Sequence, residues 1–166
     1  TALTVTILAL TVIISNDPWY APQYAVPLLG MILGNTMSGI AIGLSHLTQT
    51  VWRERVAIEA RLMLGQQQSE ATRDLRRECI RAGMIPTINM LAAAGIISLP
   101  GMMTGQILAG APPVEAVKYQ ILIMFLIAAG TGFGTVIAVT LGVKRLFDER
   151  ERLRLDRLSD KPGRGH

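Results

Sequence analysis

The sequence is poor in the residues that build soluble enzymes and disulfide-bonded domains. Cys79 is the single cysteine among 166 residues, which excludes a disulfide within the chain and a cysteine-based metal cluster. Only 17% of the residues are charged and 5% are aromatic, whereas an ordinary soluble domain has roughly 25% charged residues. Since 50% of the residues are hydrophobic and the mean hydropathy is +0.39, the composition indicates a chain that lies in lipid.

Chemical motifs are also missing. The sequence has no Ser/His/Asp grouping, no carboxylate pair within an apolar run and no His-Glu-x-x-His helix, so we expect neither an enzyme nor a cofactor in this chain. No G-x-x-x-x-G-K-[ST] sequence occurs, and the glycines from Gly130 to Gly134 lie inside an apolar run. The chain therefore has no P-loop through which to bind ATP. No basic stripe alternates with aromatic residues, which argues against a nucleic-acid partner.

The charges that are present fall into two short segments. Of the sixteen Lys and Arg residues, seven lie between Arg53 and Arg81, eight lie between Lys144 and Arg164, and Lys118 lies apart. Basic segments beside apolar spans are typical of cytoplasmic flanks. We therefore expect residues 52–84 and the C-terminus to face the cytoplasm, in a multi-pass protein of the inner (plasma) membrane.

Four apolar stretches predict the spans: 1–15, 24–47, 85–110 and 116–143. The last three are long enough for the roughly 20 residues that a spanning helix needs. The first is shorter and has no basic region before it, so we expect it to be the end of a truncated helix. The predicted fold is an all-α transmembrane bundle with a cytoplasmic amphipathic hairpin, divided into a permease domain, 1–147, and a tail, 148–166.

Glycine and proline predict where these spans pack or bend. Glycine pairs spaced by four residues leave a flat helix face that permits close packing in lipid. Proline removes a backbone donor, so the third span should kink or break near Pro100 and Gly101. A packing kink and a functional hinge both remain open for this position. The candidate hinge residues are Pro86, Pro100, Gly101 and Gly105.

Residues 53–84 have apolar positions at helical spacing on either side of Gly65. The pattern predicts two short amphipathic helices joined by a turn. Such a hairpin could lie on lipid headgroups, fold back on its own bundle or bind a partner. Glu59-Ala60-Arg61, followed by Gly65, resembles the EAA---G element of ABC-importer permeases, although Arg61 replaces the second alanine.

A second resemblance covers residues 20–150. Ile85-Pro86-Thr87-Ile88-Asn89, Gly95 to Gly105 and Ala116 to Gln120 closely resemble the FetB-type permease family, which includes bacterial iron-export permeases and plant aluminium-tolerance transporter subunits. The resemblance implies a permease subunit that is paired with an ATP-binding ABC ATPase subunit, acts as a homodimer and exports metal ions or small solutes. It also implies ATPase-coupling residues, namely Glu59, Ala60, Leu64, Gly65 and Arg81.

The residues that could line a substrate path are mostly neutral. Apart from Lys118 near the start of the fourth, the predicted spans contain no Asp, Glu, Cys or Lys, and the metal ligands stay unassigned. His46 is expected to be an interfacial histidine with a partner, and the methionines could equally be packing residues. The candidate path residues are Thr87, Asn89, Ser98, Met102, Met103, Thr104, Gln106 and Gln120. The alternatives to an ABC permease are a nucleotide-independent carrier or channel and a membrane scaffold subunit.

Overall fold

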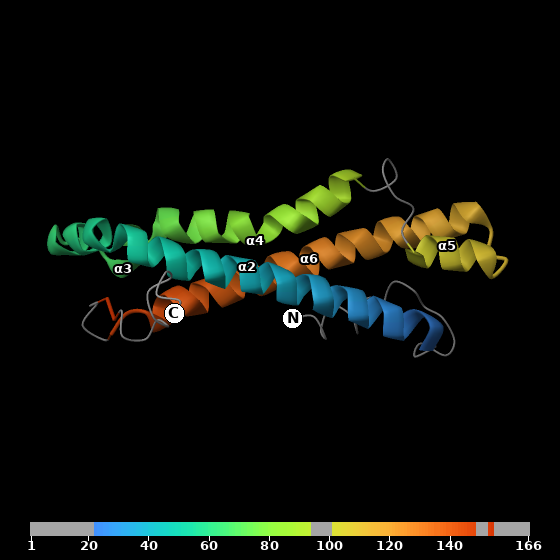
Figure 1. Ribbon diagram of the computed structural model, residues 1–166, viewed down its shortest axis with the longest axis horizontal. Coiled ribbons are helices and arrows are strands. Elements are labelled where there is room, and N and C mark those ends of the chain that lie inside the picture. Colours follow the sequence, from blue (N-terminus) through green and yellow to red (C-terminus); the bar gives the residue numbers. More distant parts are fainter. Residues whose placement is uncertain (1–21, 94–100, 149–152, 155–166) are drawn as a thin grey trace, which may run out of the picture. The chain divides into compact units, whose positions relative to one another are not determined.

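The computed structural model describes residues 22–93, 101–148 and 153–154, and most of these residues are helical. Figure 1 shows the helices in chain order. They are α2 (Pro22–Met63), α3 (Gln68–Ala71), α4 (Arg73–Ala93), α5 (Gly101–Leu108) and α6 (Pro113–Arg145). An isolated bridge between Phe147 and Leu153 is the only strand-like pairing in these ranges. The predicted all-α class is confirmed.

The helices contribute to two compact units. Unit 1 contains residues 1–39 and 84–134, and unit 2 contains residues 40–83 and 135–166. Helices α2, α4 and α6 therefore each belong to unit 1 over part of their length and to unit 2 over the rest. The first predicted span, 1–15, lies outside the described residues.

Unit 1 has an aliphatic core between α2 and α6. Leu28 and Ile32 of α2 pack with Ile123, Leu126 and Ile127 of α6. Gly130 permits the close approach, because a Cβ there would lie 3.2 Å from Ile32 Cγ2 and 3.6 Å from Thr36 Oγ1. Even the Cβ of an alanine at this position would require Ile32 to shift by a few tenths of an ångström.

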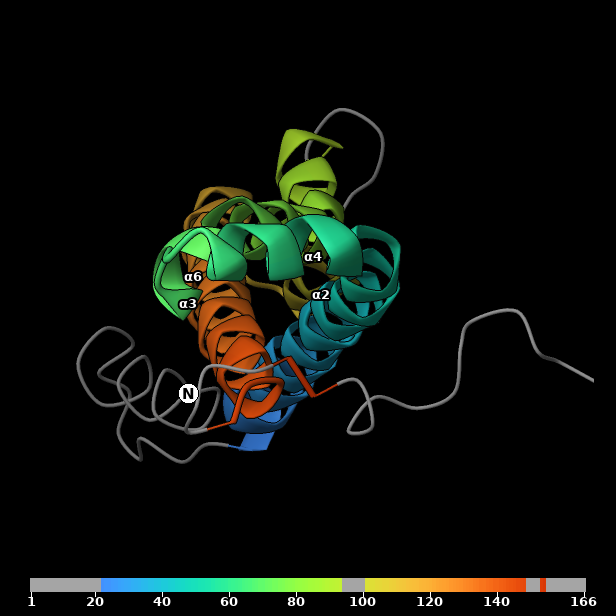
Figure 2. The same ribbon diagram turned by 90° about the vertical axis from the view of Figure 1, so that its left-hand side faces the viewer.

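Unit 2 packs α2, α4 and α6 together, and Figure 2 looks onto these helices from the side of α3. Its core contains Leu47, Val51, Ile58, Leu75, Cys79, Val139, Val143, Leu146 and Phe147. A Cβ at Gly43 would lie 3.2 Å from the Cγ2 atoms of both Thr135 and Val139, and 3.4 Å from the Cys79 carbonyl. Leu146 and Phe147 follow the end of α6 and are buried, so the chain continues into this core before the charged tail begins.

The structure corrects the predicted separation between spans and hairpin helices. We expected the second span to end near residue 47 and a short helix to follow, whereas α2 is one helix of 42 residues. No proline or glycine interrupts residues 44–63, so nothing in the chain ends the helix there. Helix α4 likewise continues from Arg73 to Ala93, with Pro86 inside it. The predicted turn is present, with Gly65 at φ +87°, a conformation that glycine adopts without steric cost.

Two helices in the described residues are long and apolar enough to cross a membrane: Val26–Met63 and Pro113–Arg145. They contain the predicted spans 24–47 and 116–143 almost completely. The predicted span 85–110 includes the end of α4 and all of α5. Ser98 and Pro100 lie outside the described residues, so the predicted break at Pro100 stays a prediction.

Candidate functional site

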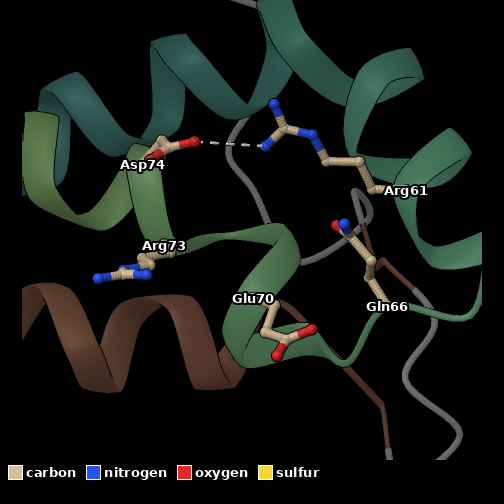
Figure 3. A pocket seen from close by; sticks show the side chains of 5 residues that line it. All are labelled: Arg61, Gln66, Glu70, Arg73 and Asp74. Atoms are coloured by element: carbon tan, nitrogen blue, oxygen red, sulfur yellow. Dashed lines mark ion pairs between the residues drawn. The ribbon is translucent and has the colours of Figure 1, made fainter.

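A polar surface hollow lies at the end of unit 2, where α2 turns into α4. Five side chains line an open pocket of about 430 Å³: Arg61, Gln66, Glu70, Arg73 and Asp74. Figure 3 shows that they come from the end of α2, the turn, α3 and the start of α4. We call residues 59–74 the hairpin tip. Its lining carries both signs of charge, which suits a polar partner surface better than an apolar ligand.

Hydrogen bonds fix the short α3 against its neighbours. Arg61 donates from Nη1 to the Ala71 carbonyl at 3.3 Å, and the same nitrogen lies 3.8 Å from Asp74 Oδ2 (Figure 3). Arg76 donates to the Ser69 carbonyl at 2.9 Å. Ala71 and Thr72 are also buried. The hairpin tip therefore has a defined shape despite its polar composition.

Four of the five predicted coupling residues lie on this tip. Glu59 and Ala60 are exposed on α2, and Leu64 and Gly65 are exposed in the turn. The side chains of Met63 and Leu64 are 86% and 84% exposed, which leaves two large apolar groups beside the charged pocket. Arg81 is also exposed, but it lies eight residues into α4, away from the start of the helix. Sequence reasoning missed Gln66, Glu70, Arg73 and Asp74 as site residues, although the last three are charged and follow the predicted turn.

The predicted path residues do not gather on one surface. Thr87 of α4 and Gln120 of α6 are buried, whereas Asn89 and Thr104 are exposed. Met103 and Gln106 of α5 are half-buried. Ser98 and the side chain of Met102 lie outside the described residues. Gln120 Oε1 has no hydrogen-bond partner, so this amide oxygen is buried with its bonding capacity unused.

Three further buried hydroxyls were missed by the sequence analysis: Thr36, Thr131 and Thr135. None of these Oγ1 atoms has a hydrogen-bond partner among the residues that the structure describes. Helical hydroxyls can donate to the carbonyl four residues earlier, and Ser38 and Thr48 do so at 3.0 Å. An unpartnered buried hydroxyl costs about 1–3 kcal/mol. In unit 1, Thr36 Oγ1 lies beside Gly130, the residue before Thr131, so polar groups occur at the α2–α6 packing contact.

A histidine and a glutamate, two residue types that can bind metals, contact each other between α2 and α4. His46 Nε2 lies 3.4 Å from Glu78 Oε1, which is the kind of partner expected for this histidine. Next to Glu78, Cys79 is fully buried. Burial, with the negative charges of Glu78 and then Glu54, raises the pKa of the Cys79 thiol to about 11, so the thiol is protonated at neutral pH. Within the described ranges, no group of three or more His, Cys, Asp or Glu side chains could hold a metal.

Comparison with known proteins places the chain in a family. The profile of the uncharacterised protein family UPF0014 matches residues 1–147. A UPF0014 membrane protein of Synechocystis, slr1647, is 42% identical over 87% of this chain and 56% of its own length. The probable iron export permease protein FetB of Escherichia coli is 36% identical over 90% of this chain and 58% of its own length. The Arabidopsis thaliana protein ALUMINUM SENSITIVE 3 is 31% identical over 73% of this chain and 43% of its own length.

The chain thus spans about half the length of the curated relatives that it matches. No solved structure matches it. The relatives include the bacterial iron-export and plant aluminium-related proteins that the sequence resembles, and none of their names describes an enzyme. With its long apolar helices and this similarity, the chain is an all-α membrane protein that belongs to the UPF0014 family.

Proposed function

We propose that the chain is part of the permease subunit of an ABC transporter, in which a separate ATPase subunit binds the hairpin tip. The observation that carries the proposal is the continuity of α2. At 1.5 Å per residue its 42 residues extend about 63 Å, which is about twice the roughly 30 Å of a hydrocarbon core. An apolar span and a polar docking surface therefore belong to one continuous helix.

Movement of the hairpin tip can be transmitted to the membrane-spanning helices through direct contacts. The tip is joined to α2 and α4 by the Arg61 and Arg76 contacts, and both helices pack on α6 through the core of unit 2. An ATPase that displaces the tip would thus move three packed helices together. The exposed Met63 and Leu64 side chains supply apolar contacts that a docking partner could bury.

The proposed substrate is a metal ion that is exported, because the Escherichia coli relative is named a probable iron export permease. The unpartnered oxygens of Thr36, Gln120 and Thr131 support a polar path, since buried polar groups in a membrane bundle usually mark substrate or ion pathways. In this arrangement the hairpin tip faces the cytoplasm and two permease subunits act as a homodimer.

Docking of the ATPase can be tested by comparing variants at two turns that each contain a glycine with positive φ, the turn after α2 and the turn between α5 and α6. The full-length protein and its ATPase are co-expressed, and co-purification is measured for Glu59→Arg and Gly65→Trp. Both should lose the ATPase while the permease still inserts into the membrane. Glu115→Arg and Gly110→Trp are the controls, because Gly110 also has a positive φ, +90°, but lies between α5 and α6. These controls should retain the ATPase.

Equal co-purification with all four variants would overturn the docking role. ATP-independent transport by the full-length protein alone, in proteoliposomes, would favour a carrier or channel instead. Loss of ATPase in the control variants as well would show a general folding defect, and would remove the assignment of the hairpin tip.

A further inference from the structure

We propose that an exposed face of α4 binds the headgroup phosphates of anionic phospholipids through Arg77 and Arg81. Both side chains are exposed, and neither makes a salt bridge within the part of the chain that the structure describes. The inference goes beyond the proposed function, because it concerns the bilayer and not the ATPase. It also gives Arg81 a different role from the coupling role that the family resemblance implies.

The charged side chains of α4 are separated by sign onto two sides of the helix. Asp74 and Glu78 each follow an arginine directly in the sequence. The Asp74 carboxylate lies 3.8 Å from Arg61 of α2, and the Glu78 carboxylate lies 3.4 Å from His46 of α2, so both carboxylates are directed toward α2. Figure 3 shows the Asp74 and Arg73 side chains pointing to opposite sides. The arginines of α4 are therefore left on a face without neighbouring counter-charges.

The arginines on this face are spaced by four residues, at positions 73, 77 and 81. Like charges at this spacing repel each other and destabilise a helix slightly. A negatively charged membrane surface attracts basic residues beside a membrane span, and it would offset this repulsion. The charge pattern of α4 is thus complementary to an anionic headgroup layer.

The same face continues into an apolar surface along α4. Ile85 follows Arg81 by four residues and is 49% exposed, and Ile88 is 53% exposed. In a regular helix, these two isoleucines lie within about 80° of the Arg77 and Arg81 positions around the axis. Ile85 is also the first residue of the predicted span 85–110. Exposed arginines followed by exposed isoleucines on one side of a helix suit the boundary between headgroups and hydrocarbon.

The rise of the helix limits which arginines reach the headgroups. Positions four residues apart lie about 6 Å apart along the axis, and the headgroup layer of one leaflet is about 5–8 Å thick. With Ile85 at the edge of the hydrocarbon, Arg81 lies within this layer. Arg77 lies at its outer edge, within reach of a long side chain. Arg73 lies about 18 Å from Ile85 along the axis, beyond the layer, and lines the pocket of the hairpin tip instead.

The test measures lipid binding to the full-length protein in detergent by native mass spectrometry. Phosphatidylglycerol is the anionic probe and phosphatidylcholine the zwitterionic one, and we expect phosphatidylglycerol to bind more tightly. Arg77→Gln and Arg81→Gln should each weaken phosphatidylglycerol binding about fivefold, the contribution of one basic residue near an anionic surface. Binding of phosphatidylcholine should not change, which checks that the variants are folded.

Arg73→Gln is the matched control, because it removes an exposed arginine from the same face of α4. It should bind phosphatidylglycerol as the unmodified protein does. The double variant Arg77→Lys/Arg81→Lys keeps both charges and should also retain the lipid. Unchanged binding in Arg77→Gln and Arg81→Gln, or an equal loss in Arg73→Gln or in the lysine variant, would overturn the proposal.

Two further measurements separate the bilayer from other partners. Glycerol 3-phosphate carries a phosphate without acyl chains and should not displace phosphatidylglycerol; displacement would indicate a site for free phosphate and overturn the lipid assignment. Arg77→Gln and Arg81→Gln should retain the ATPase in co-purification, and loss of the ATPase with unchanged lipid binding would assign this face to docking instead. Glu59→Arg should lose the ATPase and keep its affinity for phosphatidylglycerol, so the two proposals can fail independently.

Discussion

The two units differ in how they use polar groups between helices. In unit 2, ion pairs join α2 to α4 at His46–Glu78 and Arg61–Asp74, and Thr72 donates to the Gln68 carbonyl at 2.7 Å. Buried polar atoms without a hydrogen-bond partner among the described residues occur in both units: the oxygens of Thr36, Gln120 and Thr131 in unit 1, and Trp52 Nε1 and Thr135 Oγ1 in unit 2. Satisfied polar groups hold elements in one arrangement, whereas unsatisfied ones are available to water or a solute. What distinguishes unit 2 is therefore its contacts between charged side chains of α2 and α4, whereas unsatisfied buried atoms are common to both units.

The largest expected effect is at a close contact of three helices in unit 2. Gly43→Leu places a side chain where a Cβ alone is 3.2 Å from Thr135 and Val139, so we expect destabilisation of about 1–3 kcal/mol from overpacking. Cys79, the single cysteine, lies in the same core, so the accessibility of its thiol measures how far this core is disrupted. Maleimide labelling of Cys79 should become faster in this variant. Gly34→Leu is the control, because nothing lies within 4 Å of its Cβ position, and rapid labelling there as well would contradict the assignment.

The corresponding change in unit 1 tests whether the two units are separately stable. Gly130→Leu would clash with Ile32, 3.2 Å from the Cβ position, and we expect a loss of about 1–3 kcal/mol. This variant should lower the thermal transition temperature, while Cys79 stays protected from maleimide at temperatures below the transition. If Cys79 reacts as fast as in Gly43→Leu, the two units open together and the comparison between them fails.

A smaller effect is expected when a hydrogen-bonded threonine and an unpartnered threonine are each replaced by valine. Thr72→Val removes a hydroxyl that is bonded in unit 2 and should destabilise the protein by about 1 kcal/mol. Thr131→Val removes an unpartnered buried hydroxyl in unit 1, so stability should be unchanged or increased. Thermal unfolding of both variants in the same detergent measures the contrast. If both variants are equally destabilised, Thr131 makes a stabilising hydrogen bond, which would contradict its description as unpartnered.

The smallest expected effect is at the surface ion pair of the hairpin tip. Asp74 is 82% exposed and lies 3.8 Å from Arg61, a geometry for which exposed pairs contribute about 0–1 kcal/mol. Asp74→Asn should therefore leave the unfolding transition nearly unchanged, while it alters the charge of the pocket and the salt dependence of ATPase co-purification. A large loss of stability would mean that the pair holds the tip together, rather than the backbone contacts of Arg61 and Arg76.

Much of the helical architecture could be predicted from the sequence because it depends on local pattern. The apolar run 116–143 predicts α6, and Gly65 predicts the turn after α2. Helix ends were harder to predict. A change from apolar to charged residues indicates a different environment around the helix, but it does not end the helix. For this reason α2 continues to Met63 where two separate helices were expected.

The candidate site was predictable only in part for a similar reason. Glu59, Ala60, Leu64 and Gly65 follow a local motif and are exposed, and their role in coupling stays a prediction. Asp74 was not identified, because its relation to Arg61 depends on how the chain folds back through α3. The buried hydroxyls of Thr36 and Thr131 were missed because threonine is common in apolar helices, and its hydrogen-bond state cannot be read from sequence.

The sequence by itself determined the helical class, the apolar spans, the glycine turn and the family, since these depend on composition, periodicity and local motifs. Only the tertiary structure decided that α2 joins span and hairpin in one helix, that His46 lies against Glu78, and which buried oxygens lack partners. The physical reason is that a single chain segment fixes its own conformation, whereas distances between side chains on different helices are set by packing.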